Sequence, residues 1–213
     1  MTNPVSVPSL TRTDMFASIF LGAVIGALVP FILISVGVSV PLQNYLFLIF
    51  ALLAPFGLFV AHRLSAFFAP LFQIGKFGIV GSSNFFIDLG ILQLLIYLSG
   101  SASPKELFVL FIPITTWTLY KMSSFLVASV NGYVWNKLWT FQDREGSVTK
   151  EYTQYLVVSL IGLFINSVAF SIVFAFRPEG SVETLWGTIG AVAGAFVGLF
   201  WNFLGYKFIV FNK

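Results

Sequence analysis

The sequence predicts an all-α integral membrane protein with about six transmembrane helices, and three observations support this. Of the 213 residues, 58% are hydrophobic and 9% are charged, whereas a soluble domain carries about 25% charged residues. Six segments are apolar and long enough to cross a hydrocarbon core of about 30 Å. Part of the sequence is repeated, and each copy consists of two such segments.

The six segments cover about residues 16–38, 43–61, 75–99, 114–138, 152–176 and 185–209. The second segment is short and is interrupted by Pro55, which makes it the weakest of the six. Short polar breaks with turn residues separate the segments, such as SGSASPKE (99–106), QDREGSVTKE (142–151) and RPEGSVE (177–183). The first apolar run is long and lacks a clear cleavage site, so we expect an uncleaved helix; a signal peptide is the alternative.

Basic residues predict the orientation, because cytoplasmic loops carry an excess of lysine and arginine. With a cytoplasmic N-terminus, eight basic residues fall on the inner side: Arg12, Arg63, Lys76, Lys137, Arg144, Lys150, Lys207 and Lys213. Three fall on the outer side: Lys105, Lys121 and Arg177. We therefore expect a multi-pass protein of the inner (cytoplasmic) membrane with both termini in the cytoplasm.

The sequence lacks the residues that several classes of function need. It has no cysteine and a single histidine, His62, so we expect neither a metal centre nor a cofactor. It contains no Asp-x-Asp pair, no nucleophile–base constellation and no Gly-rich phosphate loop ending in Lys-Ser or Lys-Thr. We therefore expect neither an enzyme nor a nucleotide-driven pump, and we expect no nucleic-acid partner.

Two parts of the sequence resemble each other. FGIVGSSNFFIDLGIL (77–92) aligns without gaps to YLVVSLIGLFINSVAF (155–170), which places Asp88 opposite Asn166. YVWNKLWTF (133–141) aligns to FLGYKFIVF (203–211), which places Lys137 opposite Lys207. The repeats cover about 76–141 and 154–211. Since each contains two spans, we expect parallel repeats related by a pseudo-two-fold axis along the membrane normal.

The repeated segments resemble the GtrA-like family of polytopic membrane proteins. The resemblance covers about 75–211, and its most specific part is NFLGYK (202–207), which is closed by Val-Phe. The first repeat departs from this pattern, because Gly132 replaces the leading asparagine and Asn131 stands one place earlier. We therefore expect a GtrA-like four-helix membrane domain at 75–213, preceded by an accessory N-terminal helical pair at 1–74.

The resemblance implies a role in cell-surface polysaccharide synthesis or glycan modification. Family members are thought to move polyprenyl-phosphate-linked sugars to the outer leaflet, beside a membrane glycosyltransferase. The implied partners are this lipid-linked sugar, membrane lipids and the glycosyltransferase, and a homo-oligomer stays open. One alternative is a non-transporting anchor or regulatory subunit of the glycosyltransferase. Another is a proton-coupled transporter of small solutes or cations that uses Asp88.

Four residues are candidates for binding the phosphate and headgroup of such a lipid: Lys137, Lys207, Asn202 and Asn136. The two lysines lie about one turn inside the predicted cytoplasmic ends of their spans, where an ammonium group can reach a lipid phosphate. Asn202 matches the family motif, and its amide suits sugar hydroxyls or phosphate oxygens. The alternative is positive-inside anchoring within an ordinary aromatic belt.

Four further residues form a candidate polar path inside the membrane: Asp88, Lys121, Asn84 and Asn166. Asp88 lies 12 residues after Lys76, or about 18 Å along a helix, and an ionisable group at that depth is a functional candidate. Its expected partner is Lys121, about 24 Å on the outer side of Lys137. A structural ion pair, a protonated carboxyl and ordinary amide contacts between helices are the alternatives.

A stripe of small residues in GTIGAVAGAFVG (187–198) predicts a helix-packing face. It consists of Gly187, Gly190, Gly194 and Gly198. Small residues on one side of a transmembrane helix let a neighbouring helix approach closely. We expect this face to pack within the fold or against a partner.

Overall fold

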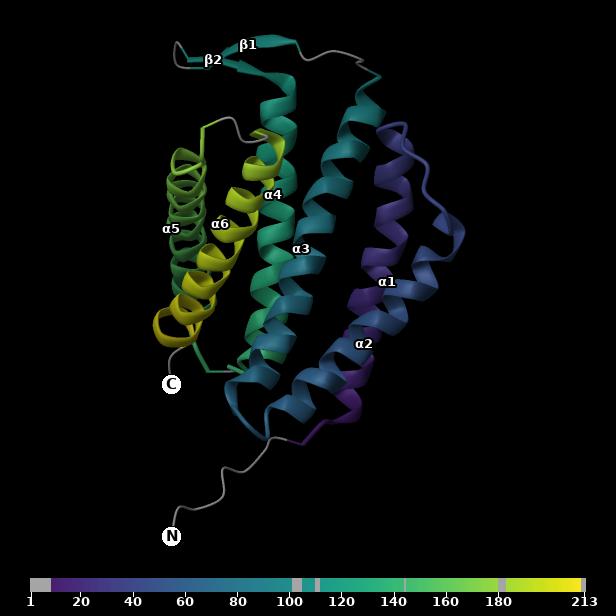
Figure 1. Ribbon diagram of the computed structural model, residues 1–213, viewed down its shortest axis with the longest axis vertical. Helices are drawn as coiled ribbons and strands as arrows, with labels where there is room; N and C mark the ends of the chain where they lie inside the picture. Colours follow the sequence, from purple (N-terminus) through teal and green to yellow (C-terminus); the bar gives the residue numbers. More distant parts are fainter. Residues whose placement is uncertain (1–8, 101–104, 110–111, 144, 180–182, 212–213) are drawn as a thin grey trace. The chain divides into compact units, whose positions relative to one another are not determined.

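The computed structural model describes residues 9–100, 105–109, 112–143, 145–179 and 183–211. These residues form six long helices and a small two-stranded hairpin, so the predicted all-α membrane fold is confirmed (Figure 1). The helices group into two compact units, an N-terminal unit Met1–Gln142 and a C-terminal unit Asp143–Lys213. Some residues of the predicted polar breaks and two of the basic residues used to predict orientation lie outside the described residues: 101–104, 180–182, Arg144 and Lys213.

Helix α1, Arg12–Ser35, begins four residues before its predicted start at 16. The reason is a capping box, in which the Thr11 hydroxyl accepts from the Asp14 amide at 3.2 Å. The Asp14 carboxylate in turn accepts from the Thr11 amide at 2.9 Å. This exchange satisfies two backbone donors that a helix start otherwise leaves without partners.

The next two helices also begin and end at residues with clear local reasons. A single 3₁₀ turn, η1 (Gln43–Tyr45), leads into α2, Leu46–Leu64. Helix α3, Pro70–Ser99, has proline in its first turn, where no backbone donor is needed. It ends before Gly100, whose φ of 61° is the left-handed conformation that glycine adopts most readily at a helix end.

A β-hairpin connects α3 to α4, and the sequence did not predict it. Strand β1, Glu106–Val109, pairs antiparallel with β2, Ile112–Thr115. Helix α4, Thr116–Trp135, begins after this hairpin and two residues later than predicted. The physical reason is Pro113, which disfavours helical backbone at the residue before it, and Thr115, whose side chain caps the helix.

Within the described residues, five helices are long and apolar enough to cross a membrane: Arg12–Ser35, Gln43–Leu64, Pro70–Ser99, Val148–Ala175 and Ile189–Val210. Helix α4, the predicted fourth span, is the exception, because Lys121, Asn131 and several hydroxyl side chains lower its hydropathy. Its 20 residues nevertheless extend about 30 Å, the thickness of a hydrocarbon core. It lies beside α3 along this length (Figure 1), and three of its polar side chains, Lys121, Ser124 and Asn131, bond to α3.

The N-terminal unit is a layer of packed helices. Helix α1 packs against α2 and α3, and α3 packs against α4. One cluster of buried residues joins α1, α2, α3 and the turn that follows α4: Ala17, Leu21, Leu58, Phe72, Val80 and Trp139. Leu58 and Val80 have no exposed surface. The helical pair outside the repeats thus shares one core with the first repeat.

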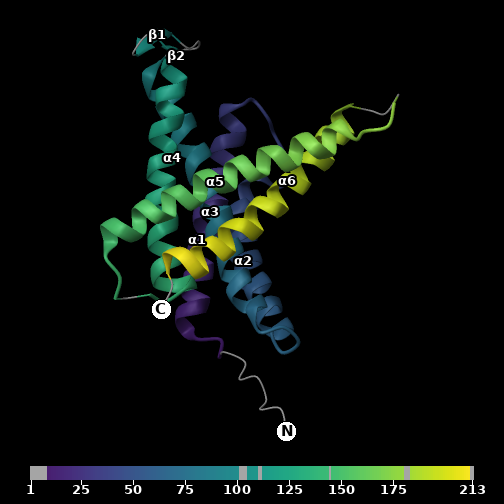
Figure 2. The same ribbon diagram turned by 90° about the vertical axis from the view of Figure 1, so that its left-hand side faces the viewer.

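The C-terminal unit is a helical hairpin of α5, Val148–Ala175, and α6, Glu183–Gly205, which lie side by side (Figure 2). The predicted packing face is confirmed for Gly190, Gly194 and Gly198, which lie against α5. A Cβ added at Gly194 would stand 2.6 Å from the backbone oxygen of Asn166. The glycine stripe therefore sets the distance between the two helices.

We expect Gly194→Ala to destabilise the protein by about 1–3 kcal/mol, because the new methyl group meets backbone and forces α5 and α6 apart. Gly81→Ala on α3 is the matched control, since a Cβ there meets no described atom within 4 Å. It should be neutral or stabilising by up to about 1 kcal/mol. Thermal unfolding of both variants in detergent checks this; equal stabilities would contradict the close packing.

Candidate functional site

Each repeat ends in a short π-helix that carries one candidate lysine as its second residue. Helix α4 continues into η2, Asn136–Thr140, and α6 continues into η3, Tyr206–Val210. The amide of Phe141 donates to the Asn136 carbonyl, and that of Phe211 to the Tyr206 carbonyl, both at 2.8 Å. Such π turns are rare in proteins, and those that occur are often found at functional sites. The sequence alignment placed the lysines opposite each other but gave no sign of the π turns.

The first polar contact between α3 and α4 involves Asp88. Its carboxylate forms an ion pair with Lys121 and accepts a hydrogen bond from the Ser124 hydroxyl at 2.5 Å. The predicted contact between Asp88 and Lys121 is therefore present. The Lys121 side chain is 49% exposed and that of Asp88 is 17% exposed. The pair lies at the edge of the helix interface.

The equivalent position in the second repeat has no charge. Asn166, which aligns with Asp88, lies against Gly194, and Gly194 aligns with Ser124. The same two positions therefore touch in both repeats, as the alignment requires. In the second repeat the small glycine replaces the hydroxyl, and Asn166 packs against α6.

The second polar contact also has a counterpart in each repeat. In the first, the Asn131 amide donates to the Asn84 oxygen at 2.7 Å. In the second, Gly162, which aligns with Asn84, lies directly against the side chain of Asn202. Asn84 is thus replaced by glycine in the second repeat, and the asparagine that contacts this glycine, Asn202, stands one position later in the alignment than Asn131.

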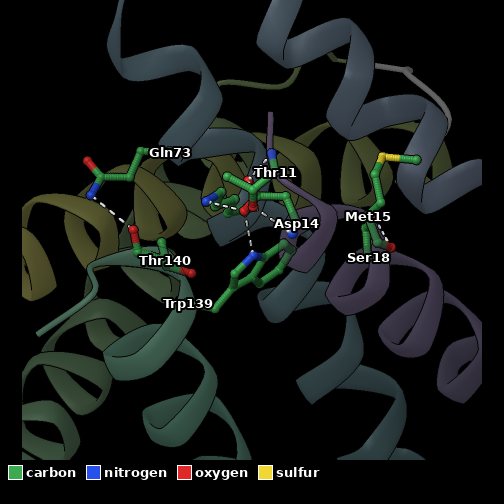
Figure 3. Close-up of polar contacts among 8 residues, drawn as sticks. Thr11, Asp14, Met15, Ser18, Gln73, Trp139 and Thr140 are labelled. Atoms are coloured by element: carbon green, nitrogen blue, oxygen red, sulfur yellow. Dashed lines mark hydrogen bonds and ion pairs between the residues drawn. The ribbon is translucent and has the colours of Figure 1, made fainter. Parts of the chain in front are cut away.

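The end of the N-terminal unit where α3 begins and η2 lies carries two lysines, and we call it the basic end. Here Lys76 forms an ion pair with Asp14 of α1 at 2.5 Å. The indole N–H of Trp139 donates to the same Asp14 oxygen at 2.9 Å (Figure 3). All three side chains are buried, with Asp14 only 2% and Lys76 only 4% exposed. A buried charge pair of this kind needs such additional hydrogen bonds to offset its desolvation.

Aromatic rings and a second hydrogen bond complete the basic end. The Lys76 ammonium lies 4.6 Å from the ring centre of Phe72 and 5.6 Å from that of Trp139. Gln73 of α3 donates from its side-chain amide to the Thr140 carbonyl at 3.2 Å (Figure 3). Two neighbouring residues of η2 are thus held by α1 and α3.

The four predicted headgroup residues lie on or beside the two π turns. Lys137 is buried, and the Lys207 ammonium lies 5.6 Å from the ring centre of Phe203. The side-chain oxygens of Asn136 and Asn202 are buried, and neither has a hydrogen-bond partner within the described parts of the chain. Buried polar atoms normally have partners, so these two amides are candidates for accepting a hydrogen bond from a bound molecule.

Asp14 was not among the predicted site residues. The first span was expected to start at 16, so Asp14 lay outside the predicted helix. Thr11 and Asp14 have the Thr-x-x-acid spacing of a capping box, and that spacing is a signal for an earlier helix start. A carboxylate so close to an apolar run in a charge-poor chain was also a sign of a buried partner.

Lysine and asparagine side chains together can bind an anionic, hydroxyl-bearing molecule. Lysine ammonium groups bind phosphate oxygens through charge-assisted hydrogen bonds, and amide oxygens accept from hydroxyl groups. Across the described ranges, no three His, Cys, Asp or Glu residues come together as a metal site requires.

Comparison with known proteins places most of the chain in one family of membrane domains. The family model of the GtrA/DPMS transmembrane domain matches residues 76–211. Over 142 residues the chain is 28% identical to YngA of Bacillus subtilis, described as an uncharacterized membrane protein, covering 65% of this chain and 79% of YngA. Over 129 residues it is 29% identical to a dolichol-phosphate mannosyltransferase of Pyrococcus furiosus, covering 60% of this chain and 32% of that enzyme. The chain therefore spans about a third of the mannosyltransferase.

Proposed function

We propose, given that the chain belongs to the GtrA/DPMS transmembrane-domain family, that it moves a polyprenyl-phosphate-linked sugar from the cytoplasmic to the outer leaflet. The relation to a dolichol-phosphate mannosyltransferase supports a lipid-linked sugar as the cargo. Its use in building or modifying cell-surface polysaccharide or glycan is part of the proposal, as are an inner-membrane location and cytoplasmic termini.

The observation that carries the proposal is the repeated π turn with a lysine at the same place. Lys137 and Lys207 are each the second residue of their turn. In a membrane, a lysine near a helix end reaches the headgroup level while its methylene groups stay in apolar surroundings. A lipid phosphate carries its charge at that level, so both lysines are suited to engage it.

The two asparagines supply the complementary chemistry for the sugar. The side-chain oxygens of Asn136 and Asn202 are buried acceptors, and sugar hydroxyl groups are donors. Asn136 lies in the π turn of the first repeat, and Asn202 lies one turn before that of the second. We propose that these amides accept hydrogen bonds from the headgroup once phosphate is bound.

The polar contacts of the first repeat offer a route for the headgroup through the membrane. The Asp88–Lys121 pair and the Asn84–Asn131 pair lie on the same α3–α4 interface. A sugar passing them exchanges hydrogen bonds instead of losing them all in hydrocarbon. Asn166 is the equivalent residue of the second repeat. Net direction then comes from synthesis of the lipid inside and its consumption outside.

A second function is favoured by one comparison. The relative from Pyrococcus furiosus is a mannosyltransferase of which the matched segment is a part. This supports the alternative that the chain anchors or regulates a separate membrane glycosyltransferase without moving lipid. In that case the enzyme is the partner, and the helix surfaces matter more than the lysines.

Reconstitution separates the two functions. Purified protein in liposomes should move a short-chain polyprenyl-phosphate sugar between leaflets faster than protein-free liposomes do. The alternative predicts no movement, together with a higher activity of a polyprenyl-phosphate glycosyltransferase when the two are reconstituted together. Lack of movement with folded protein and several sugars would overturn the proposed transport.

Replacing Asp88 with asparagine should slow lipid movement about threefold to tenfold, which is a barrier increase of roughly 0.7–1.4 kcal/mol. The ion pair with Lys121 is lost, while the amide that replaces the carboxylate can still accept from the Ser124 hydroxyl. Binding of lipid phosphate at the π turns should not change. A transport assay run at several pH values checks this; a rate in the original protein that follows a proton gradient would instead favour ion coupling through Asp88.

A further inference from the structure

We propose that Asp14 is a positioning residue that fixes the π turn carrying Lys137, by way of Trp139. The proposal deepens the proposed function, on which it rests for what Lys137 binds. It assigns a role to α1, which lies outside the residues 76–211 that match the family.

The Asp14 carboxylate is itself held rigidly. One oxygen accepts from the Thr11 amide at 2.9 Å and from the Thr11 hydroxyl at 2.7 Å. The other oxygen receives the Lys76 ammonium at 2.5 Å and the Trp139 indole N–H at 2.9 Å. Both oxygens are therefore engaged, and the helix start determines where the carboxylate points (Figure 3). A buried acceptor with this many partners is a fixed point for η2.

The anchored residue lies next to the lysine in question. Trp139 and Lys137 belong to the same five-residue π turn, two positions apart. The following residue, Thr140, is held at its carbonyl by Gln73. A π turn is a rare backbone conformation, and such conformations persist where their surroundings favour them. The bonds from Asp14 and Gln73 supply that support at two adjacent residues.

Lys76 neutralises the Asp14 carboxylate, so that Asp14 can fix the π turn beside the proposed phosphate site at Lys137. An uncompensated Asp14 at the basic end would repel a phosphate group. The ion pair with Lys76 cancels its charge, and both groups are almost fully buried. Lys76 is thereby committed to an internal contact, and the turn is anchored without added negative charge.

The second repeat lacks the two residue types that pair with Asp14 in the first. Ile209 aligns with Trp139 and Gln154 aligns with Lys76, so neither the indole N–H nor the ammonium group is present. The turn η3 is instead supported within its own hairpin. The Tyr206 hydroxyl bonds the Ser159 hydroxyl at 2.6 Å, and the Tyr206 ring stacks on Tyr155. The two lysine turns are thus alike in backbone and different in support.

The first test removes the anchor and leaves the ion pair. Trp139→Phe keeps an aromatic ring but loses the N–H that bonds Asp14. We expect the backbone amides of 137–141 to exchange hydrogen roughly tenfold faster, since a bond to a charged group is lost. The matched control is Trp135→Phe, which removes the same group from the ring that packs on Trp139 at 6.1 Å. Unchanged exchange of 137–141 in Trp139→Phe, or equal acceleration in the control, would overturn the proposal.

The second test asks whether the anchor acts through Lys137. Trp139→Phe should weaken binding of farnesyl phosphate about threefold to tenfold. In the Lys137→Gln background the same change should have no further effect, because its target is already absent. Additive losses would assign Trp139 a merely structural role and overturn the proposal.

The two failures are distinguishable. If the original protein does not bind farnesyl phosphate, the proposed function fails. The exchange of 137–141 still decides whether Asp14 fixes the turn, because that measurement needs no ligand.

Discussion

Replacing Lys137 and Lys207 together with alanine is expected to weaken farnesyl phosphate binding by at least about a hundredfold. Each lysine contributes a charge-assisted hydrogen bond, which is worth about 1.5–3 kcal/mol, or roughly tenfold to a hundredfold in affinity. Each single variant should therefore lose about tenfold or more. Calorimetry or competition against a fluorescent prenyl phosphate, in detergent at fixed ionic strength, measures these affinities.

Two controls make this result specific. Lys150→Ala removes an exposed lysine from the first turn of α5, which belongs to neither π turn, and should leave the affinity unchanged. Farnesol, which lacks the phosphate, should bind the original protein and the double variant equally. Retention of phosphate binding in the double variant would show that the two lysines serve only as membrane anchors.

Replacing Asp14 with asparagine should destabilise the protein by about 3–5 kcal/mol, because it leaves the Lys76 ammonium buried without a counter-charge. The N-terminal unit should be affected most, since α1 and α3 both lose their shared contact. Thermal or denaturant unfolding in detergent, followed by circular dichroism, measures the loss.

The double variant Asp14→Asn/Lys76→Met is the matched control for this effect. It removes both charges while keeping an acceptor for Trp139 and an apolar chain between the rings of Phe72 and Trp139. Replacing a buried pair by neutral groups is often close to neutral, so most of the stability should return. Similar losses in the single and double variants would mean that the ion pair itself contributes little.

The membrane fold could be predicted because its signals are local. Long apolar runs mark the helices, and an ungapped repeat marks the two hairpins. The glycine spacing of Gly190, Gly194 and Gly198 correctly predicted a packing face. The contact of Asp88 with Lys121 followed from depth alone, since two charges at similar depth on neighbouring helices have few other partners.

What the sequence did not reveal depends on contacts between distant residues. Asp14 and Trp139 are 125 residues apart, so no local pattern joins them. A π turn differs from an α-helical one by a single shifted hydrogen bond, which side-chain periodicity over five residues does not register. The strands β1 and β2 were not predicted for a different reason. A short apolar run between helices is compatible with either helix or strand.

The N-terminal helical pair shows how a match to a family domain can understate a functional unit. The matched residues begin at 76, yet α1 supplies Asp14 to the first repeat and shares its core. We expect that deleting α1 and α2 would leave Lys76 without its carboxylate and η2 without one of its two supports. The N-terminal helical pair and the first hairpin therefore form one packed unit.

The most direct test of the central claim is transbilayer movement of a short-chain polyprenyl-phosphate sugar in liposomes that contain only this protein. The original protein, Lys137→Ala/Lys207→Ala and Lys150→Ala should be compared at matched amounts of folded protein. We expect movement above protein-free liposomes for the original and Lys150→Ala proteins, and movement at the protein-free rate for the double variant. Movement that survives loss of both lysines would contradict this expectation.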